Sequence, residues 1–332
     1  MKKRSIIQLA LILLVCVLLV SIALTQDKDQ DKEKIRVFYA GSLIVPFEEI
    51  EREFEKLHPD VDLQMEGHGS IQVIRHVTEI HEGVDVIAVA DSSLIPDMMY
   101  PDYAESYIEF ATNEMVIAYT DDSRYADEIT EENWYEILKR PDVKFGFSNP
   151  MLDSCGYRTL MVAQLAEIYY ENQTIFEDMI GCNFNPPILV NEKNGTYIIV
   201  VPAIFEPDTK KVIVRGGSVQ LLSLLEYGEI DYAFLYKSVA EQHGLRSVDL
   251  PSEIDLGSPE YEDTYEKVVV QLGFQRFSSA DIDRIGKSIL YGITAPSNAP
   301  NKDIATEFVE FVMSEEGQSI LHEMNQPTLD YT

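Results

Sequence analysis

The sequence is poor in cysteine and in basic residues. Of its 332 residues three are cysteine, and 26 Lys and Arg stand against 57 Asp and Glu, which gives a formal net charge of −31. Three cysteines are too few for a disulfide-stapled domain, so the hydrophobic residues, 45 % of the chain, must hold the fold together. Nucleic acids and anionic lipid surfaces bind basic patches, so the charge argues against both as partners.

Motifs of common exported hydrolases are also missing. The sequence contains no Gly-x-Ser-x-Gly elbow, no His-Glu-x-x-His pair and no phosphate-binding P-loop. An exported hydrolase that pairs Asp153 with a histidine is the alternative from another functional class. Because no motif supports it, we predict a protein that is not an enzyme and that carries no cofactor.

The longest apolar run lies at the amino terminus. Three basic residues precede residues 6–24, which contain no charged residue. This run is long for a signal peptide and just long enough to span a bilayer, so residues 1–24 are either a signal peptide or an N-terminal membrane anchor. No small residue directly precedes Cys16, so lipid attachment is not expected. With residues 25–34 as a charged linker, the folded part is expected extracellularly or at the outer face of the membrane.

Beyond the linker, short apolar strands alternate with helices. Strands are predicted at 35–39, 61–65 and 84–90, with helices at 45–57 and 70–81 between them. Alternation of this kind indicates an α/β fold with a parallel sheet.

A second strand-helix series begins after Asn113. The predicted strands are 114–119, 144–147, 231–236 and 268–271, and the predicted helices are 131–140, 155–170, 218–227, 279–291 and 302–313. Two β-rich runs within 197–215 are expected to form a hairpin that turns at residues 206–209.

Two Gly-Ser turns each follow a strand and open a helix. They are Gly41-Ser42 and Gly67-His68-Gly69-Ser70. The first turn of a helix offers unpaired N–H groups and partial positive charge, so an anion can bind there without a lysine. Both serines could instead be plain helix caps. Together, at the carboxyl edge of one sheet, the turns predict a site for a small oxygen-rich ligand.

A third turn, Asp153-Ser154-Cys155, opens the long helix predicted at 155–170. Asp153 could simply cap that helix. Beside a bound anion its carboxylate would repel the ligand, so in a binding site it must contact the central atom of the ligand or carry a proton.

Several motifs in combination resemble those of the archaeal tungstate/molybdate-binding proteins, the extracellular solute receptors of an ABC importer. The motifs are Tyr39-Ala40-Gly41-Ser42-Leu43, Gly67-x-Gly69-Ser70, Val84-Asp85-Val86 with Ala90-Asp91, Asn149-Pro150-x-Leu152-Asp153-x-Cys155-Gly156-Tyr157-Arg158, and Asp231-Tyr232-Ala233-Phe234-Leu235-Tyr236-Lys237-Ser238. The resemblance runs from about residue 35 to residue 325.

The resemblance implies a type II periplasmic-binding-protein fold, in which two α/β lobes with mixed sheets are joined by two crossing strands around a ligand cleft. The crossings are expected near residues 113–119 and 232–238. Lobe I would then comprise residues 35–113 and 238–332, and lobe II residues 114–237. The implied role is to close over tungstate or molybdate and deliver it to a membrane permease, and we expect a monomer.

The family's pocket is implied to comprise Gly41, Ser42, Ser70, Asp153, Ser154, Cys155 and Tyr236. In the family two carboxylates approach the metal of the bound oxyanion, one of them at the position of Asp153. The other belongs to an Arg-Pro-Lys-Glu motif, where this chain reads Arg215-Gly216-Gly217-Ser218.

Ser218 supplies no carboxylate, so we expect either a lower coordination number with Asp153 alone or tetrahedral binding by hydrogen bonds. Gly216-Gly217-Ser218 could form a backbone nest for the anion, or only a flexible turn. The missing glutamate leaves open a receptor for sulfate or phosphate.

Two other groups of residues have the chemistry of a possible site. Cys155 and Cys182 could form a disulfide or remain free thiols. His76 and His81 have a spacing seen in zinc sites, but five residues along a helix place them on different faces, so we do not expect a metal site there.

Overall fold

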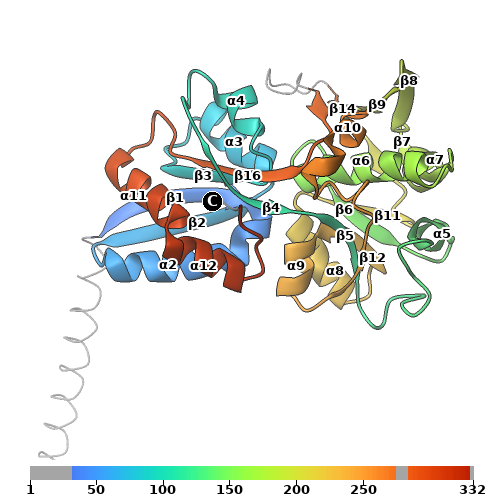
Figure 1. Ribbon diagram of the computed structural model, residues 1–332, viewed down its shortest axis with the longest axis horizontal. Coiled ribbons are helices and arrows are strands. Elements are labelled where there is room, and N and C mark those ends of the chain that lie inside the picture. The colour runs from blue at the N-terminus through green and yellow to red at the C-terminus, as the bar shows by residue number, and fades with distance from the viewer. Residues whose placement is uncertain (1–31, 274–282, 330–332) are drawn as a thin grey trace, which may run out of the picture.

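The computed structural model describes residues 32–273 and 283–329. Two α/β bodies lie side by side, each around a five-stranded sheet, and the first body combines elements from both ends of the chain (Figure 1). The expected signal peptide or anchor and most of the expected linker lie outside the described residues. The first strand, β1, begins at Glu33, within the last residues of that linker.

The first sheet has the strand order β2-β1-β3-β16-β4. Its strands are β1 Glu33–Ala40, β2 Val61–His68, β3 Val86–Val89, β4 Ile108–Asn113 and β16 Ile289–Thr294. β1 pairs in parallel with β2 and β3, as the strand-helix alternation predicts, whereas β16 is antiparallel to both of its neighbours. The sheet is therefore mixed.

Helices cover both faces of this sheet (Figure 1). They are α2 Ile44–Leu57, α3 Ser70–Thr78, α4 Leu94–Met99, α11 Lys302–Met313 and α12 Glu315–Glu323. α2 buries Phe47, Ile50 and Phe54 completely, and the ring of Phe54 lies edge-on to Phe308 of α11. This apolar stripe fixes α2, and with it the turn that precedes α2.

The second sheet has the order β11-β6-β12-β5-β13. Its strands are β5 Met115–Tyr119, β6 Phe145–Ser148, β11 Val212–Arg215, β12 Tyr232–Tyr236 and β13 Arg246–Asp249. β6 pairs in parallel with β11 and β12, and β5 is antiparallel to β12 and β13.

The helix α6, Ser154–Tyr169, lies at the centre of the second body, and every residue from Ser154 to Ala166 is buried. The other helices there are α5 Trp134–Lys139, α7 Ile175–Met179, α8 Leu222–Glu226, α9 Lys237–Gln242 and α10 Glu262–Tyr265. Short 3₁₀ helices are η1 Gly41–Leu43, η2 Gly181–Asn183, η3 Ser218–Leu221 and η4 Pro259–Tyr261.

The hairpin expected over residues 197–215 is wrong. β9, Thr196–Val201, pairs with β8, Leu189–Lys193, and β14, Val268–Leu272, whereas β11 pairs with β6 in another sheet. The hairpin is β8–β9, and its turn at Asn194-Gly195 has positive φ at both residues, as a two-residue turn requires. Residues near the expected turn instead form β10, Glu206–Pro207, which pairs with β7, Phe184–Asn185.

The helix expected over residues 279–291 is also wrong. Residues 279–282 lie outside the described residues, and the remainder contains β15, Arg284–Ile285, and the start of β16. β16 is flanked by β3 and β4, and its burial on both faces removes the alternation that marks a half-exposed strand.

The chain passes from the first sheet to the second between β4 and β5. The second crossing does not lie near residues 232–238, because β12 is an inner strand of the second sheet and β13 still belongs to that sheet. The chain returns to the first sheet with β16. Residues 246–249 therefore pair with the second sheet rather than the first. No helix within residues 32–273 and 283–329 is long and apolar enough to cross a membrane.

Candidate ligand-binding site

A cavity of about 130 Å³ lies where turns from the two sheets meet. It is lined by Gly41, Gly67, His68, Gly69, Gln72, Asp153, Gly216, Gly217, Ser218, Val219 and Gln220. The described residues that line it include no lysine and no arginine, and Asp153 is the one carboxylate among them. An anion in this cavity would therefore be held by neutral hydrogen-bond donors.

Strand pairing explains why these turns meet. Tyr39 and Ala40 of β1 lie opposite Gly67 and His68 of β2, so the two Gly-Ser turns emerge at the same edge of the first sheet. β6 and β11 pair in parallel, which likewise brings the loop before α6 next to the turn at 216–218. Gly41 of the first turn and Gly67 and Gly69 of the second line the same cavity.

The turns of the two bodies are in direct contact. The N–H groups of Ile71 and Gln72 donate to the carbonyl of Leu152 at 3.1 and 3.2 Å. A Cβ on Gly69 would lie only 2.4 Å from that carbonyl oxygen. Glycine is thus required at position 69 because the loop before α6 packs against its backbone.

Asp153 lies on the cavity wall with a buried carboxyl group. The N–H of Ser218 donates to Oδ2 of Asp153 at 2.9 Å. Burial raises the pKa of Asp153, and hydrogen bonds from the Ser218 and Cys155 backbones partly oppose this rise. Where the family motif has a carboxylate, Ser218 therefore places a backbone N–H that is bonded to Asp153 in this structure.

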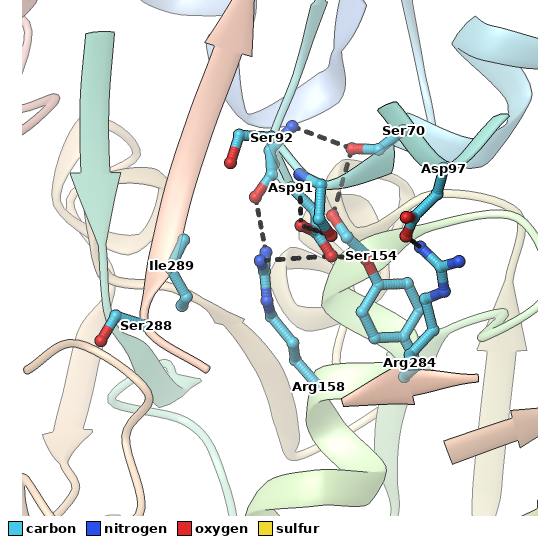
Figure 2. Close-up of polar contacts among 12 residues, drawn as sticks. Ser70, Asp91, Ser92, Asp97, Ser154, Arg158, Arg284, Ser288 and Ile289 are labelled. Atoms are coloured by element: carbon cyan, nitrogen blue, oxygen red, sulfur yellow. Dashed lines mark hydrogen bonds and ion pairs between the residues drawn. The ribbon is translucent and has the colours of Figure 1, made fainter. Parts of the chain in front are cut away.

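The predicted hydroxyl groups lie in a buried network beside the cavity rather than on its wall. The Oγ atoms of Ser70 and Ser154 are 3.1 Å apart, and Ser154 Oγ is 3.0 Å from the hydroxyl of Tyr236. Figure 2 shows Ser70 and Ser154 facing one another across the boundary between the bodies. Ser42 joins the network through Tyr291, whose hydroxyl lies 2.8 Å away and whose ring contacts that of Tyr236.

Cys155 and Cys182 do not form a disulfide with each other. Cys155 is buried with its thiol directed at the carbonyl of Phe234, 3.6 Å away, and Cys182 is exposed. Burial raises the pKa of Cys155, so its side chain is a neutral thiol. Cys155 can therefore contribute its backbone N–H to the site. That group already forms a hydrogen bond with Asp153.

Sequence reasoning missed the ionic link between the bodies. Asp91 follows β3 of the first body, and Arg158 belongs to α6 of the second (Figure 2). Arg158 Nη1 donates to the carbonyl of Ala90 at 2.6 Å and to Tyr236 at 2.7 Å, and its guanidinium lies 3.8 Å from Asp91. Burial alone would raise the pKa of Asp91, but Arg158, Lys287 and Arg284 hold that pKa well below its usual range.

Two of the histidines lie in contact. His68 and His76 stack with ring centroids 4.8 Å apart, but the described residues contain no group of three or more His, Cys, Asp or Glu side chains placed to hold a metal ion.

Sequence reasoning also missed two glutamines that line the cavity. Gln72 and Gln220 end the identical patterns Gly69-Ser-x-Gln and Gly217-Ser-x-Gln, which stand on opposite bodies. The repeated pattern was the available signal.

The sequence is similar to those of known solute-binding proteins. Residues 35–324 match the family model described as bacterial extracellular solute-binding protein. The chain is 45 % identical over 295 residues to an uncharacterized solute-binding protein of Methanococcus maripaludis, which covers 89 % of this chain and 83 % of the relative. It is 44 % identical over 303 residues to the molybdate/tungstate-binding protein of Pyrococcus abyssi, covering 89 % of this chain and 85 % of that protein.

The fold has relatives among solved structures. The periplasmic molybdate-binding protein of Azotobacter vinelandii superposes with a TM-score of 0.54 at 11 % sequence identity, covering 89 % of this chain and 100 % of that one. The expected periplasmic-binding-protein fold is thereby confirmed. Members of the matched family bind solutes rather than catalyse reactions. Because the family model spans most of the chain, the chain belongs to the bacterial extracellular solute-binding protein family.

Proposed function

We propose that the protein captures tungstate or molybdate outside the cell and delivers it to the permease of an ABC importer. The observation that carries the proposal is the cavity built from neutral glycine turns of both bodies, with Asp153 as its one carboxylate. The name of the Pyrococcus abyssi relative supports the choice of ligand. Glycine turns let a dianion approach backbone N–H groups closely. The protein needs such local donors because its net charge of −31 repels an anion at long range.

In this proposal Gly41 and the turn Gly216-Gly217-Ser218 supply backbone donors, and Ser42, Ser70, Ser154, Cys155 and Tyr236 supply the surrounding hydroxyl and backbone groups. Asp153 approaches the metal of the oxyanion. Ser218 cannot add a second carboxylate, so the bound metal keeps a lower coordination number than in the family's six-coordinate arrangement.

The bodies act as two lobes that close on the ligand. Strand pairing supports residues 32–113 and 289–329 as lobe I and residues 115–273 and 283–285 as lobe II. An anion that satisfies N–H groups from both lobes binds the closed form better than the open form, and it shifts the population by that difference in affinity. The permease recognises the closed monomer. Residues 1–24 direct export, and they are either cleaved as a signal peptide or kept as an anchor at the outer face of the membrane.

Isothermal titration calorimetry of the protein lacking residues 1–31 tests the proposal, with tungstate, molybdate, sulfate and phosphate as ligands. We expect tungstate and molybdate to bind at least tenfold more tightly than the other two. Tighter binding of sulfate or phosphate would identify a receptor for another oxyanion. Binding of none of the four would contradict the proposed function.

A further inference from the structure

Two side-chain amides flank the cavity in matching positions. Gln72 follows Ser70 in lobe I, and Gln220 follows Ser218 in lobe II, and both residues line the cavity. Each stands three residues after a glycine, in the same Gly-Ser-x-Gln pattern. The cavity therefore has a pseudo-symmetric pair of amides, one from each lobe.

Each amide is oriented by its own turn. Oε1 of Gln72 accepts a hydrogen bond from the N–H of Gly69 at 3.3 Å, and Oε1 of Gln220 accepts one from the N–H of Gly217 at 3.4 Å. Among residues 32–273 and 283–329, neither Nε2 atom has a hydrogen-bond partner. A primary amide has two N–H donors on that nitrogen, and because Gln72 is only partly buried and Gln220 is exposed, these donors are open to solvent and to a ligand in the cavity.

We propose that Gln72 and Gln220 are ligand-binding residues that donate their amide N–H groups to the oxyanion from opposite lobes. This inference rests on the proposed function and deepens it. Since the cavity wall has no lysine or arginine, the ligand's charge must be met by neutral donors. The amides add such donors without adding a positive charge. A positive charge would also attract the protein's own carboxylates, which would compete with the bound anion.

The amides present only donors to the ligand. A donor N–H needs a lone pair on the ligand, whereas the proton of a protonated ligand oxygen needs an acceptor. With each Oε1 committed to a glycine N–H, the amides add no acceptor, and Asp153 is the one carboxylate among the described wall residues that could accept such a proton. Tungstate, molybdate and sulfate at neutral pH carry no proton, whereas monohydrogen phosphate carries one.

The variants Gln72→Glu and Gln220→Glu separate ligand binding from turn stabilisation. Glutamate keeps an oxygen that accepts the glycine N–H, and it is a favoured residue at this place in a capped turn. It replaces the N–H donors with a negative charge. We expect each variant to keep the melting temperature of the wild type and to lose at least tenfold in tungstate affinity, because a hydrogen bond to a charged acceptor is lost and repulsion is added.

Gln64→Glu is the matched control, since it places the same charge on β2 without lining the cavity. Calorimetry with tungstate on the wild type and the three variants should show losses only for positions 72 and 220. Wild-type affinity in Gln72→Glu and Gln220→Glu, or an equal loss in Gln64→Glu, would overturn the inference while leaving the proposed function intact. A wild-type protein that binds no oxyanion would overturn both.

Discussion

At the scale of single residues, the site pairs neutral donors with one carboxylate. Asp153 already accepts the N–H of Ser218, so in the ligand-free protein this carboxylate occupies a donor that a bound anion could use. Its raised pKa has burial as its main cause. Two effects on ligand affinity follow: contact between Asp153 and a metal centre stabilises the complex, whereas repulsion of the ligand's oxygens weakens it.

Asp153→Asn distinguishes these effects by comparing two ligands. Tungsten can accept an additional oxygen ligand and the sulfur of sulfate cannot, so we expect the substitution to weaken tungstate binding at least tenfold while leaving sulfate binding unchanged or tighter. Calorimetry with both ligands provides the measurement. Equal changes for tungstate and sulfate would show that the carboxylate does not touch the metal.

Ser42→Ala and Ser70→Ala test the hydroxyl network. Each removes one hydroxyl next to the cavity, and a hydrogen bond to a charged acceptor contributes about 1.5 to 3 kcal/mol, so tungstate affinity should fall about ten- to hundredfold. Ser319→Ala, on the exposed side of α12, is the control. Unchanged affinity in both cavity variants would mean that the network supports the fold and does not reach the ligand.

The residue types at the site were largely predictable, and their arrangement was only partly so. A glycine and a serine after a strand indicate a donor-rich turn, and this signal found Gly41 and Gly69. The pairing of Ser70 with Ser154 could not be derived, because it depends on how the two lobes pack. Gln72 and Gln220 were missed because an amide in the first turn of a helix reads as an ordinary polar residue.

At the scale of elements, the turns owe their positions to paired strands. The predicted strands at 35–39 and 61–65 were correct because their apolar residues are bounded by turn and helix signals. β16 was missed because its first residues were assigned to the helix predicted at 279–291, and periodicity alone does not distinguish a short buried strand from a buried helix segment. The β8–β9 hairpin, in contrast, carries the Asn194-Gly195 signal that favours a two-residue turn.

Gly69→Ala tests the contact between the turns of the two lobes. A Cβ at this position would collide with the backbone carbonyl of Leu152, so the loop must shift and the hydrogen bonds from Ile71 and Gln72 must weaken. We expect faster hydrogen exchange at the N–H groups of Ile71 and Gln72, together with weaker tungstate binding.

Gly216→Ala provides the comparison for that variant, because the nearest atom to its new Cβ would be a flexible side-chain oxygen at 3.6 Å. Its exchange rates at Ile71 and Gln72 should match those of the wild type. If the N–H groups of Ile71 and Gln72 exchange as slowly in Gly69→Ala as in the wild type, the turns of the two lobes are not held together at this point.

At the scale of the whole molecule, ion pairs connect the lobes. Asp91 and Arg158 meet across the boundary, and Arg284 of β15 lies 3.2 Å from Asp97 of α4 (Figure 2). Because the pKa of Asp91 is held low in the folded protein, its carboxylate stabilises the fold at neutral pH. This stabilisation is lost progressively as the pH falls from the ordinary aspartate range through that low folded-state value.

Asp91→Asn should lower the free energy of unfolding by about 3 to 5 kcal/mol at neutral pH, since it leaves the guanidinium of Arg158 buried without its counter-charge. Urea denaturation measures this change. Asp127→Asn removes a carboxylate whose side chain is 98 % exposed and should cost less than about 1 kcal/mol. Similar losses in the two variants would contradict a specific role for the link between the lobes.

The central claim is that neutral turns from two lobes capture a metal oxyanion in a strongly acidic protein. Anomalous X-ray scattering at the tungsten edge, from crystals grown with equimolar tungstate, tests it most directly. We predict one strong tungsten peak between Gly41, Gly69 and Gly217, on the side of Asp153. A tungsten atom bound elsewhere, or a cavity without tungsten at saturating tungstate, would contradict the account.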